Sequence, residues 1–408
     1  MINTSILLLT ISGVFLLGFF GNLFFKRTKI SDLFILLLVG FLIGPIFHLI
    51  PDSILVLLKS FAPFFGAIAL MLLLFQGGLY LNFYKVLKEL SKATFFTILV
   101  FVLTIVFVTS FTYFVFNIPV LYGILIGAII GGTSSAVVIP LVNGSSTDDD
   151  TKTLLTLESA ITDSLCLVVA MVVINIIVSK TASIQSITSN LFAAYAISIV
   201  IGVFGGLFWI KILRDSKYAR EFGYLLTLSF LIALYVLIEF ANGNGAFGAL
   251  IFGIVLGNSS EIIKIFKMND FALDLEILKF QSEISLFIKS FFFIYLGVII
   301  NLAGINSKLI IIAVSIVILI LIARYIVIKA FSKKSELFKE SGNLIFSLHA
   351  RGLAAAVLAT YPIAIGIVNE LTIIILPIVF LVILITNLTT TIYFFRAEKK
   401  LSEINTNS

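Results

Sequence analysis

Residues 156–174 read TLESAITDSLCLVVAMVVI, which places two acids, Glu158 and Asp163, inside a helix long enough to cross a bilayer. A carboxylate at membrane depth costs roughly 3 kcal/mol, so such an acid usually has a function. At 3.6 residues per turn, Ser159 and Asp163 share one face of this helix, and Glu158 and Thr162 share the next. We therefore expect Ser159 and Asp163 to face an ion while Glu158 has a separate partner. The alternative is that both acids only hold neighbouring helices together.

The composition of the whole chain agrees with a membrane location. Of its 408 residues, 60% are hydrophobic and only 12% are charged, and the mean hydropathy is +1.20. Soluble domains contain about 25% charged residues. The apolar runs are of bilayer-spanning length and do not alternate with period two, so they predict helices rather than a β-barrel. We expect an all-α polytopic protein in a lipid bilayer, and we attribute the net charge of +6 to basic loops, not to nucleic-acid binding.

The apolar runs predict about thirteen membrane spans in a single transmembrane unit, residues 1–397, followed by a short cytoplasmic tail, 398–408. The predicted spans are 5–25, 31–48, 60–82, 93–116, 119–143, 151–178, 188–211, 221–240, 244–257, 282–302, 308–330, 341–362 and 371–395. With the N-terminus outside, 21 of the 27 Lys and Arg residues fall in inside loops or the tail and two in outside loops. Positive charge marks the cytoplasmic side, so we expect an N-out, C-in orientation.

Two spans are interrupted by small or polar residues at corresponding places. Residues 131–135 (GGTSS) interrupt the fifth span, and 349–352 (HARG) interrupt the twelfth. Paired broken helices indicate an inverted repeat, here six spans, a linker and six spans, with the substrate site between two broken, crossing helices. Thr133 and Ser134 would then offer oxygens to a cation at the first break, and Thr162 on the sixth span is a further candidate for the ion site. The alternative is that these small residues only allow close helix packing.

Other polar residues inside the spans need an explanation too. Arg324, deep in the eleventh span, requires a carboxylate partner, for which Glu158 is the candidate; the alternative is that Arg324 reaches the inner interface. If they pair, Asp163 remains as the titratable acid. Arg351 and His349 are expected to support the second break, although a lone His is more often a packing residue. Gln76, near the inner end of the third span, is a candidate for the ion path.

Metal-ligand spacings, Ser/His/Asp arrangements and a P-loop pattern are not found in the sequence. We therefore expect neither an enzyme nor a resident cofactor. The paired breaks favour a secondary transporter over an ion channel, which needs no inverted repeat, and the lack of a roomy polar constellation argues against a symporter for organic solutes.

Six stretches give the chain a resemblance to the monovalent cation/proton antiporters of the sodium/proton exchanger type, close to the NhaP group. They are, in order, 75–79 (FQGGL), 132–135 (GTSS), 157–163 (LESAITD), 291–297 (FFFIYLG), 323–324 (AR) and 350–354 (ARGLA). In the same order they resemble, or stand in the place of, the family's F-E-G-G-L, T-D-P, E-S-x-x-N-D and F-F-x-x-x-G, a buried Arg and R-G-A.

The resemblance implies a homodimer in which a core part, including spans 119–178 and 308–362, moves against a dimerisation part, including 5–25 and 188–211. It implies that Asp163 binds the proton or the cation with help from Ser159 and Thr133, and that Glu158 pairs with Arg324. The expected membrane is the inner or plasma membrane of a prokaryote.

Three departures from the family pattern bear on the transported ion. The family's Asn before the aspartate is Thr162, its T-D aspartate is Ser134, and its F-E-G-G glutamate is Gln76. Each replacement keeps an oxygen but has no charge. One exchangeable carboxylate then remains, which predicts electroneutral exchange of one proton for one monovalent cation, sodium first and potassium as the alternative.

Overall fold

The computed structural model describes residues 32–50, 52–80, 83–179, 184–216, 222–265, 275–300, 306–364 and 366–407, together with 12, 13, 16–21 and 23. In this part of the chain the regular structure is entirely helical. Most of the first predicted span, 5–25, lies outside the described residues, as do the connectors that the ranges omit.

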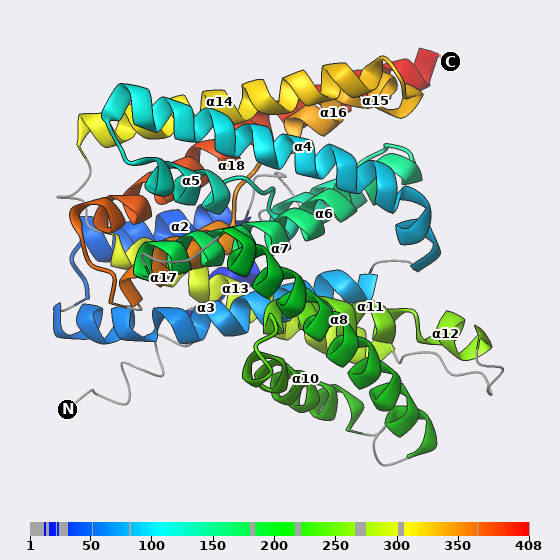
Figure 1. Ribbon diagram of the computed structural model, residues 1–408. Helices are drawn as coiled ribbons and strands as arrows, with labels where there is room; N and C mark the ends of the chain where they lie inside the picture. Colours follow the sequence, from blue (N-terminus) through cyan, green and yellow to red (C-terminus); the bar gives the residue numbers. More distant parts are fainter. Residues whose placement is uncertain are drawn as a thin grey trace. The chain divides into compact units, whose positions relative to one another are not determined.

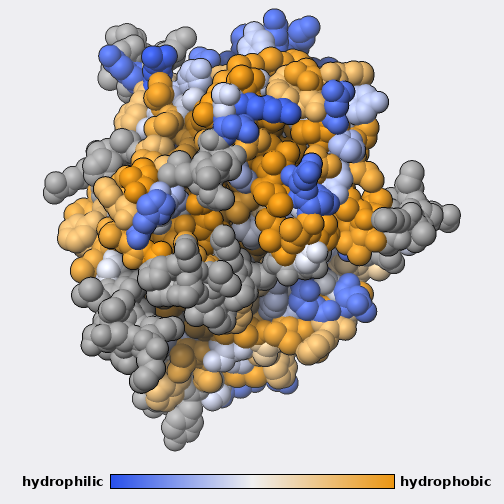
Figure 2. Space-filling view, turned by 90° about the vertical axis from the view of Figure 1, so that its left-hand side faces the viewer, coloured by the Kyte–Doolittle hydropathy of each residue, from blue (hydrophilic) through white to orange (hydrophobic). Residues whose placement is uncertain are grey.

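Six described helices are long and apolar enough to cross a membrane. They lie in α4 (Phe83–Phe116), α7 (Asp149–Ser179), α8 (Ile184–Asp215), α10 (Gly223–Phe240), α14 (Ser307–Ser332) and α18 (Glu370–Asn407). Five shorter apolar helices accompany them. Large apolar side chains such as Phe114, Phe204 and Phe240 are exposed, and apolar residues cover much of the face seen in Figure 2. The polytopic helical membrane fold is therefore confirmed, whereas the number of spans, the repeat and the orientation stay predictions.

The chain divides into two compact units. Unit 1 contains residues 1–66, 89–178 and 289–408, and unit 2 contains 67–88 and 179–288. One boundary falls inside α4, and two others fall inside α3 (Asp52–Tyr80) and α13 (Leu275–Ile299), so each of these helices contributes one part to each unit.

Unit 2 is built on the packing of α8, α10 and α11 (Gly245–Gly257), which is followed by the short α12 (Ser259–Ile265). Its apolar core includes Trp209, stacked on Phe230 at 4.4 Å between ring centroids, and Phe75, stacked on Phe252 at 5.3 Å. Gly253 lets α11 approach α3 closely, because a Cβ atom there would collide with the backbone oxygen of Phe75. The predicted span 188–211 forms part of α8.

Unit 1 begins with α2 (Asp32–Phe41), which continues as a π-helical turn, η1 (Leu42–Ile46). The long helices α4 and α14 run side by side in it (Figure 1), joined by the ring of Phe96, which lies 5.7 Å from that of Phe331 and 5.0 Å from that of Phe338. Helix α18 packs against α14.

Both predicted interruptions are present. Helix α5 (Val120–Ile129) and helix α6 (Ser135–Asn143) are separated by residues 130–134. The short α15 (Glu336–Glu340) leads into α16 (Gly342–Ser347), and residues 348–352 separate α16 from α17 (Leu353–Ala364). The sequence marks both breaks with small and polar residues, and at both the backbone leaves free N–H and C=O groups inside the protein.

Candidate ion-binding site

Asp163 on α7 lies against the first break. Its Oδ2 accepts hydrogen bonds from the backbone N–H of Ser135, at 3.3 Å, and from the Ser135 hydroxyl, at 2.5 Å. Ser135 is the first residue of α6, so the carboxylate sits at a helix N-terminus, where free N–H groups and the helix dipole favour a negative charge. The side chain is only 8% exposed. Among the described residues Asp163 forms no ion pair, and its side-chain hydrogen bonds come from the neutral donors of Ser135.

Ser135, rather than the predicted Ser134, is the serine that contacts this carboxylate. Ser134 instead donates its backbone N–H to the backbone oxygen of Ala350, at 2.9 Å. This bond joins the first break directly to the second. The hydroxyl of Ser134 has no hydrogen bond to Asp163 among the contacts of the described residues, and its role as an ion ligand stays a prediction.

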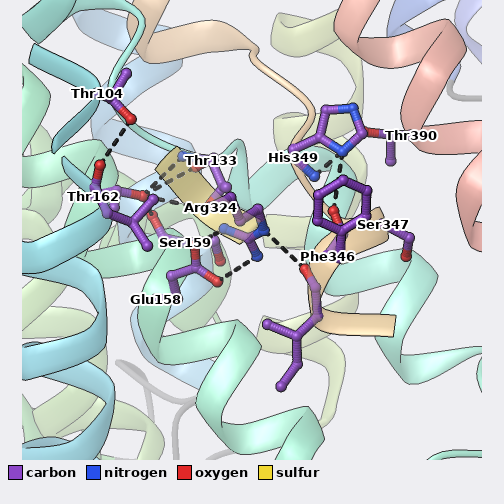
Figure 3. Close-up of polar contacts among 12 residues, drawn as sticks. Thr104, Thr133, Glu158, Ser159, Thr162, Arg324, Phe346, Ser347, His349 and Thr390 are labelled. Carbon is purple, nitrogen blue, oxygen red and sulfur yellow. Dashed lines mark hydrogen bonds and ion pairs between the residues drawn. The ribbon is translucent and has the colours of Figure 1, made fainter. Parts of the chain in front are cut away.

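Thr162 fastens α7 to the unwound backbone. Its Oγ1 accepts from the N–H of Thr133 at 3.1 Å and lies 3.3 Å from both the hydroxyl and the carbonyl oxygen of Thr133. Figure 3 shows the two threonines pointing toward each other. The approach requires Gly132, because a Cβ atom there would lie 2.6 Å from Cys166 Sγ and 2.9 Å from the Cβ of Thr162. The unwound segment is thereby held next to Asp163.

Ser159, one turn before Asp163, is fully buried. In this conformation its hydroxyl donates to the carbonyl oxygen of Thr156, at 3.0 Å, within its own helix. A hydroxyl that donates in this way still has its oxygen lone pairs available to a cation. Its predicted role as a ligand therefore remains open to test.

Glu158 and Arg324 form a buried ion pair in which both side chains are 1% exposed. The guanidinium Nη1 lies 2.5 Å from Oε1 and Nη2 lies 2.9 Å from Oε2, a two-pronged geometry that Figure 3 shows clearly. Arg324 also donates from Nε to the carbonyl oxygen of Ile345, at 2.8 Å, and its guanidinium lies 5.6 Å from the ring centre of Phe96. The side chain therefore does not reach toward the surface, and the pair joins α7, α14 and α16.

The second break is held by α18 through residues that the sequence analysis did not single out. The hydroxyl of Thr386 accepts from the N–H of Arg351 at 3.1 Å, and that of Thr390 accepts from the N–H of His349 at 3.3 Å. Asn387 donates its amide to the carbonyl oxygen of Arg351 at 2.8 Å. The signal was present in the sequence as the polar run TNLTTT, 386–391, inside an otherwise apolar span.

The two basic residues of the second break are buried. His349 is fully buried, with Nε2 at 2.8 Å from the hydroxyl of Thr389 and Nδ1 at 3.2 Å from the carbonyl oxygen of Phe346. Arg351 is 1% exposed and donates from Nη1 to the carbonyl oxygen of His349, at 3.2 Å. That contact is of the kind expected from a residue supporting a broken helix, which stays its predicted role. Gln76 is partly exposed and belongs to unit 2, whereas all the other predicted site residues belong to unit 1.

Known proteins resemble this chain over most of its length. The structure of the sodium proton antiporter MjNhaP1 from Methanocaldococcus jannaschii, at pH 8, superimposes with a TM-score of 0.78 over 98% of this chain and 99% of that one, at 22% identity. In sequence, the chain is 26% identical over 291 residues to a probable Na(+)/H(+) antiporter 2 of the same organism, 68% of this chain and 65% of that protein. It is 28% identical over 239 residues to the K(+)/H(+) antiporter NhaP2 of a Shewanella species, 57% of this chain and 40% of that protein.

The matched regions thus span less than two thirds of the length of these curated relatives. A family model covers far more of the chain. It describes the transmembrane part of sodium/hydrogen exchangers and matches residues 11–396, which include both breaks and all the site residues described above. The chain therefore belongs to the sodium/hydrogen exchanger family.

Proposed function

We propose that this protein is a secondary antiporter that exchanges protons for a monovalent cation by alternating access. The observation that supports the proposal most directly is the placement of Asp163, a buried carboxylate beside the joined breaks of two helices, hydrogen-bonded to Ser135. Such a group can exchange one positively charged guest for another, because a proton and a cation both neutralise it. The family is one of exchangers rather than enzymes, in agreement with the sequence analysis.

We propose sodium as the transported ion and potassium as the second candidate. Relatives named for Na(+)/H(+) exchange and for K(+)/H(+) exchange both match the chain, and the former match over a larger share of it. The proposed ligands are the carboxylate of Asp163 with oxygens of Thr133, Ser159 and, from the structure, Ser135. Neutral hydroxyl and carbonyl oxygens beside one carboxylate suit a hard monovalent cation.

Measurement of proton flux in proteoliposomes tests the activity and the ion together. Lithium, sodium, potassium and rubidium are added in turn across a range of pH, and we expect saturable proton movement with sodium above potassium. Strict coupling between the two fluxes distinguishes an antiporter from a cation channel. Cation flux that does not saturate, or that proceeds without opposing proton flux, would refute the proposal.

We further propose that exchange is electroneutral. Glu158 is neutralised by Arg324, and Thr162, Ser134 and Gln76 cannot ionise, so Asp163 is the single carboxylate left to exchange its proton. Each net charge moved across 100 mV would be worth about 2.3 kcal/mol. A potassium diffusion potential of either sign should therefore leave the initial proton flux of sodium-loaded proteoliposomes unchanged. A rate that rises with one sign and falls with the other would show that a second charge travels in the cycle.

The finer architecture is part of the same proposal. The two broken helices, each followed by one more span in its half, support an inverted repeat, and the distribution of Lys and Arg supports the N-out orientation. We propose a homodimer in a prokaryotic cell membrane, with the predicted spans 5–25 and 188–211 in the dimerisation part. Crosslinking in native membranes, with cysteines placed on the exposed face of α8, would test that assignment.

A further inference from the structure

The part of α13 that belongs to unit 2 carries two buried polar side chains that the proposed ion site does not use. Gln281 is fully buried and Ser285 is 2% exposed. They stand four residues apart, so they share one face of the helix. The amide nitrogen and oxygen of Gln281 and the hydroxyl of Ser285 make no hydrogen bond to any residue that the structure describes. Three polar atoms are thus enclosed together without partners.

Their surroundings make this arrangement costly. Ile284 and Ile288, on the same side of α13, pack against the apolar core of unit 2, which includes Phe75 and Phe252. Glu283, on the other side of the helix, is exposed. A buried donor or acceptor without a partner costs about 1–3 kcal/mol, and three such atoms lie within one helical turn. Leucine at both positions would avoid this cost, so we expect the polar atoms to have a hydrogen-bonding partner from outside the chain.

We propose that Gln281 and Ser285 form a hydration site, a place in unit 2 where ordered water is bound. An amide offers two donor hydrogens and two lone pairs, and a hydroxyl adds one donor and two lone pairs, which matches the two to four partners of a buried water. Side chains one turn apart on a helix lie about 5–6 Å from each other at Cβ, a gap that a bridging water can fill. The two side chains offer donor hydrogens as well as lone pairs, which suits water, because water both donates and accepts hydrogen bonds.

The hydration site of Gln281 and Ser285 does not depend on the proposed antiport. The chemistry that defines the site is that of water and neutral hydrogen-bonding groups.

The test uses the silver ion, a small water-soluble probe that reacts with thiols. Cysteine is placed at the two polar positions, as Gln281→Cys and Ser285→Cys, and at two matched apolar positions on the same side, as Ile284→Cys and Ile288→Cys. The single native cysteine, Cys166, is buried, so the wild-type protein gives the background rate. Protein in detergent is exposed briefly to silver, quenched and unfolded, and the remaining thiols are counted with a maleimide by mass spectrometry.

We expect the cysteines at 281 and 285 to react at least about tenfold faster than those at 284 and 288. The exposed fractions of the wild-type side chains alone predict the reverse order of reaction rates, because both isoleucines are more exposed than Gln281 or Ser285. If both polar-position variants elute as folded protein and react no faster than the controls, the inference is wrong. Transport is not measured, so a failure here is distinct from a failure of the antiport proposal.

A second measurement needs no thiol. If no water is bound there, Gln281→Leu removes an amide nitrogen and an amide oxygen that are buried without partners. The unfolding temperature would then rise or stay the same. At a hydrated site the same change leaves Ser285 and its water short of a partner, so the unfolding temperature should fall. A rise would therefore count against the inference as directly as slow silver labelling would.

Discussion

The two helix breaks of unit 1 are held in different ways. The first, 130–134, is held by α7 through Thr162 and through Asp163, an acid that can gain or lose a proton. The second, 348–352, is held by α18 through Thr386, Asn387 and Thr390, which stay neutral at every accessible pH. The first break can therefore respond to what Asp163 binds, whereas the second provides a fixed frame. The two meet at a single backbone hydrogen bond, from Ser134 to Ala350.

The largest expected effect comes from neutralising the acid at the first break. Asp163→Asn should abolish exchange, because an amide can bind neither the exchanged proton nor the charge of a cation. It should leave the fold intact, since the amide oxygen can still accept from Ser135. Proton flux in proteoliposomes measures the first effect, and thermal unfolding measures the second. Exchange above half of the wild-type rate would remove Asp163 from the mechanism.

The next effect is on stability. Glu158→Ala leaves Arg324 buried without its carboxylate, at a cost of about 3–5 kcal/mol, and should destabilise more than Asp163→Asn. Combining Glu158→Leu with Arg324→Met should recover part of that loss, since two apolar side chains need no pairing. Thermal unfolding in detergent checks both statements. A double variant that melts below either single variant would show that the pair does not stabilise the fold in this way.

A matched pair of substitutions addresses the comparison between the breaks directly. Thr162→Val and Thr386→Val each remove the hydroxyl that accepts a buried backbone N–H, and each should cost about 1–3 kcal/mol. Only Thr162→Val should also raise the cation concentration for half-maximal exchange, by about tenfold if 1.4 kcal/mol of binding is lost. Thr104→Val is the control, because that hydroxyl bonds only within α4. Equal shifts in both variants would mean that the second break is no fixed frame.

The smallest effect is expected where α7 begins. Asp148 accepts from the N–H of Thr151 at 2.7 Å and from the Ser341 hydroxyl at 3.3 Å, so it caps α7 and ties it to the turn before α16. Burial raises the pKa of Asp148, but hydrogen bonds from Thr151 and Thr147 outweigh burial and hold that pKa below its ordinary value. The side chain is largely exposed, so Asp148→Ala should cost only about 0.5–1 kcal/mol at neutral pH.

The pH dependence of that cost follows from the lowered pKa. The stabilisation is present above the ordinary aspartate pKa of about 4 and is lost as the pH falls through the lower value of the folded state. Unfolding of the wild type and Asp148→Ala is therefore compared at pH 7 and below pH 4, and the difference should close in acid. Asp148→Asn, which keeps an accepting oxygen, should lie between the two.

The sequence predicted the parts of the site that depend on charge and helical spacing. An arginine deep in an apolar span needs an acidic partner, and Glu158 was the candidate because Asp163 was expected to bind the ion. The side chains of Arg324 and Glu158 are in contact. The interruptions were visible because glycine and serine runs stand out among apolar residues. These features follow from the high cost of buried charge and of unpaired backbone groups, which few arrangements can meet.

Other parts of the site could not be read from the sequence. The choice between Ser134 and Ser135 depends on the direction in which α6 leaves the break, which no local pattern determines. The hydroxyl of Thr386 donates to the carbonyl oxygen of Val382 in its own helix, so its second role becomes visible only when a distant segment lies against it. The sequence analysis did not single out Gln281 and Ser285, because their burial and lack of partners are visible only in the structure.

The bond between Ser134 and Ala350 has a consequence for how this protein can change over evolutionary time. Both atoms belong to the main chain, so this hydrogen bond does not depend on which side chain stands at position 134. Nineteen of the twenty amino acids supply the same donor, and proline alone lacks it. This contact therefore places no demand on the side chain at position 134. A saturation library at that codon, selected only for folded protein, should be depleted of proline before any other residue.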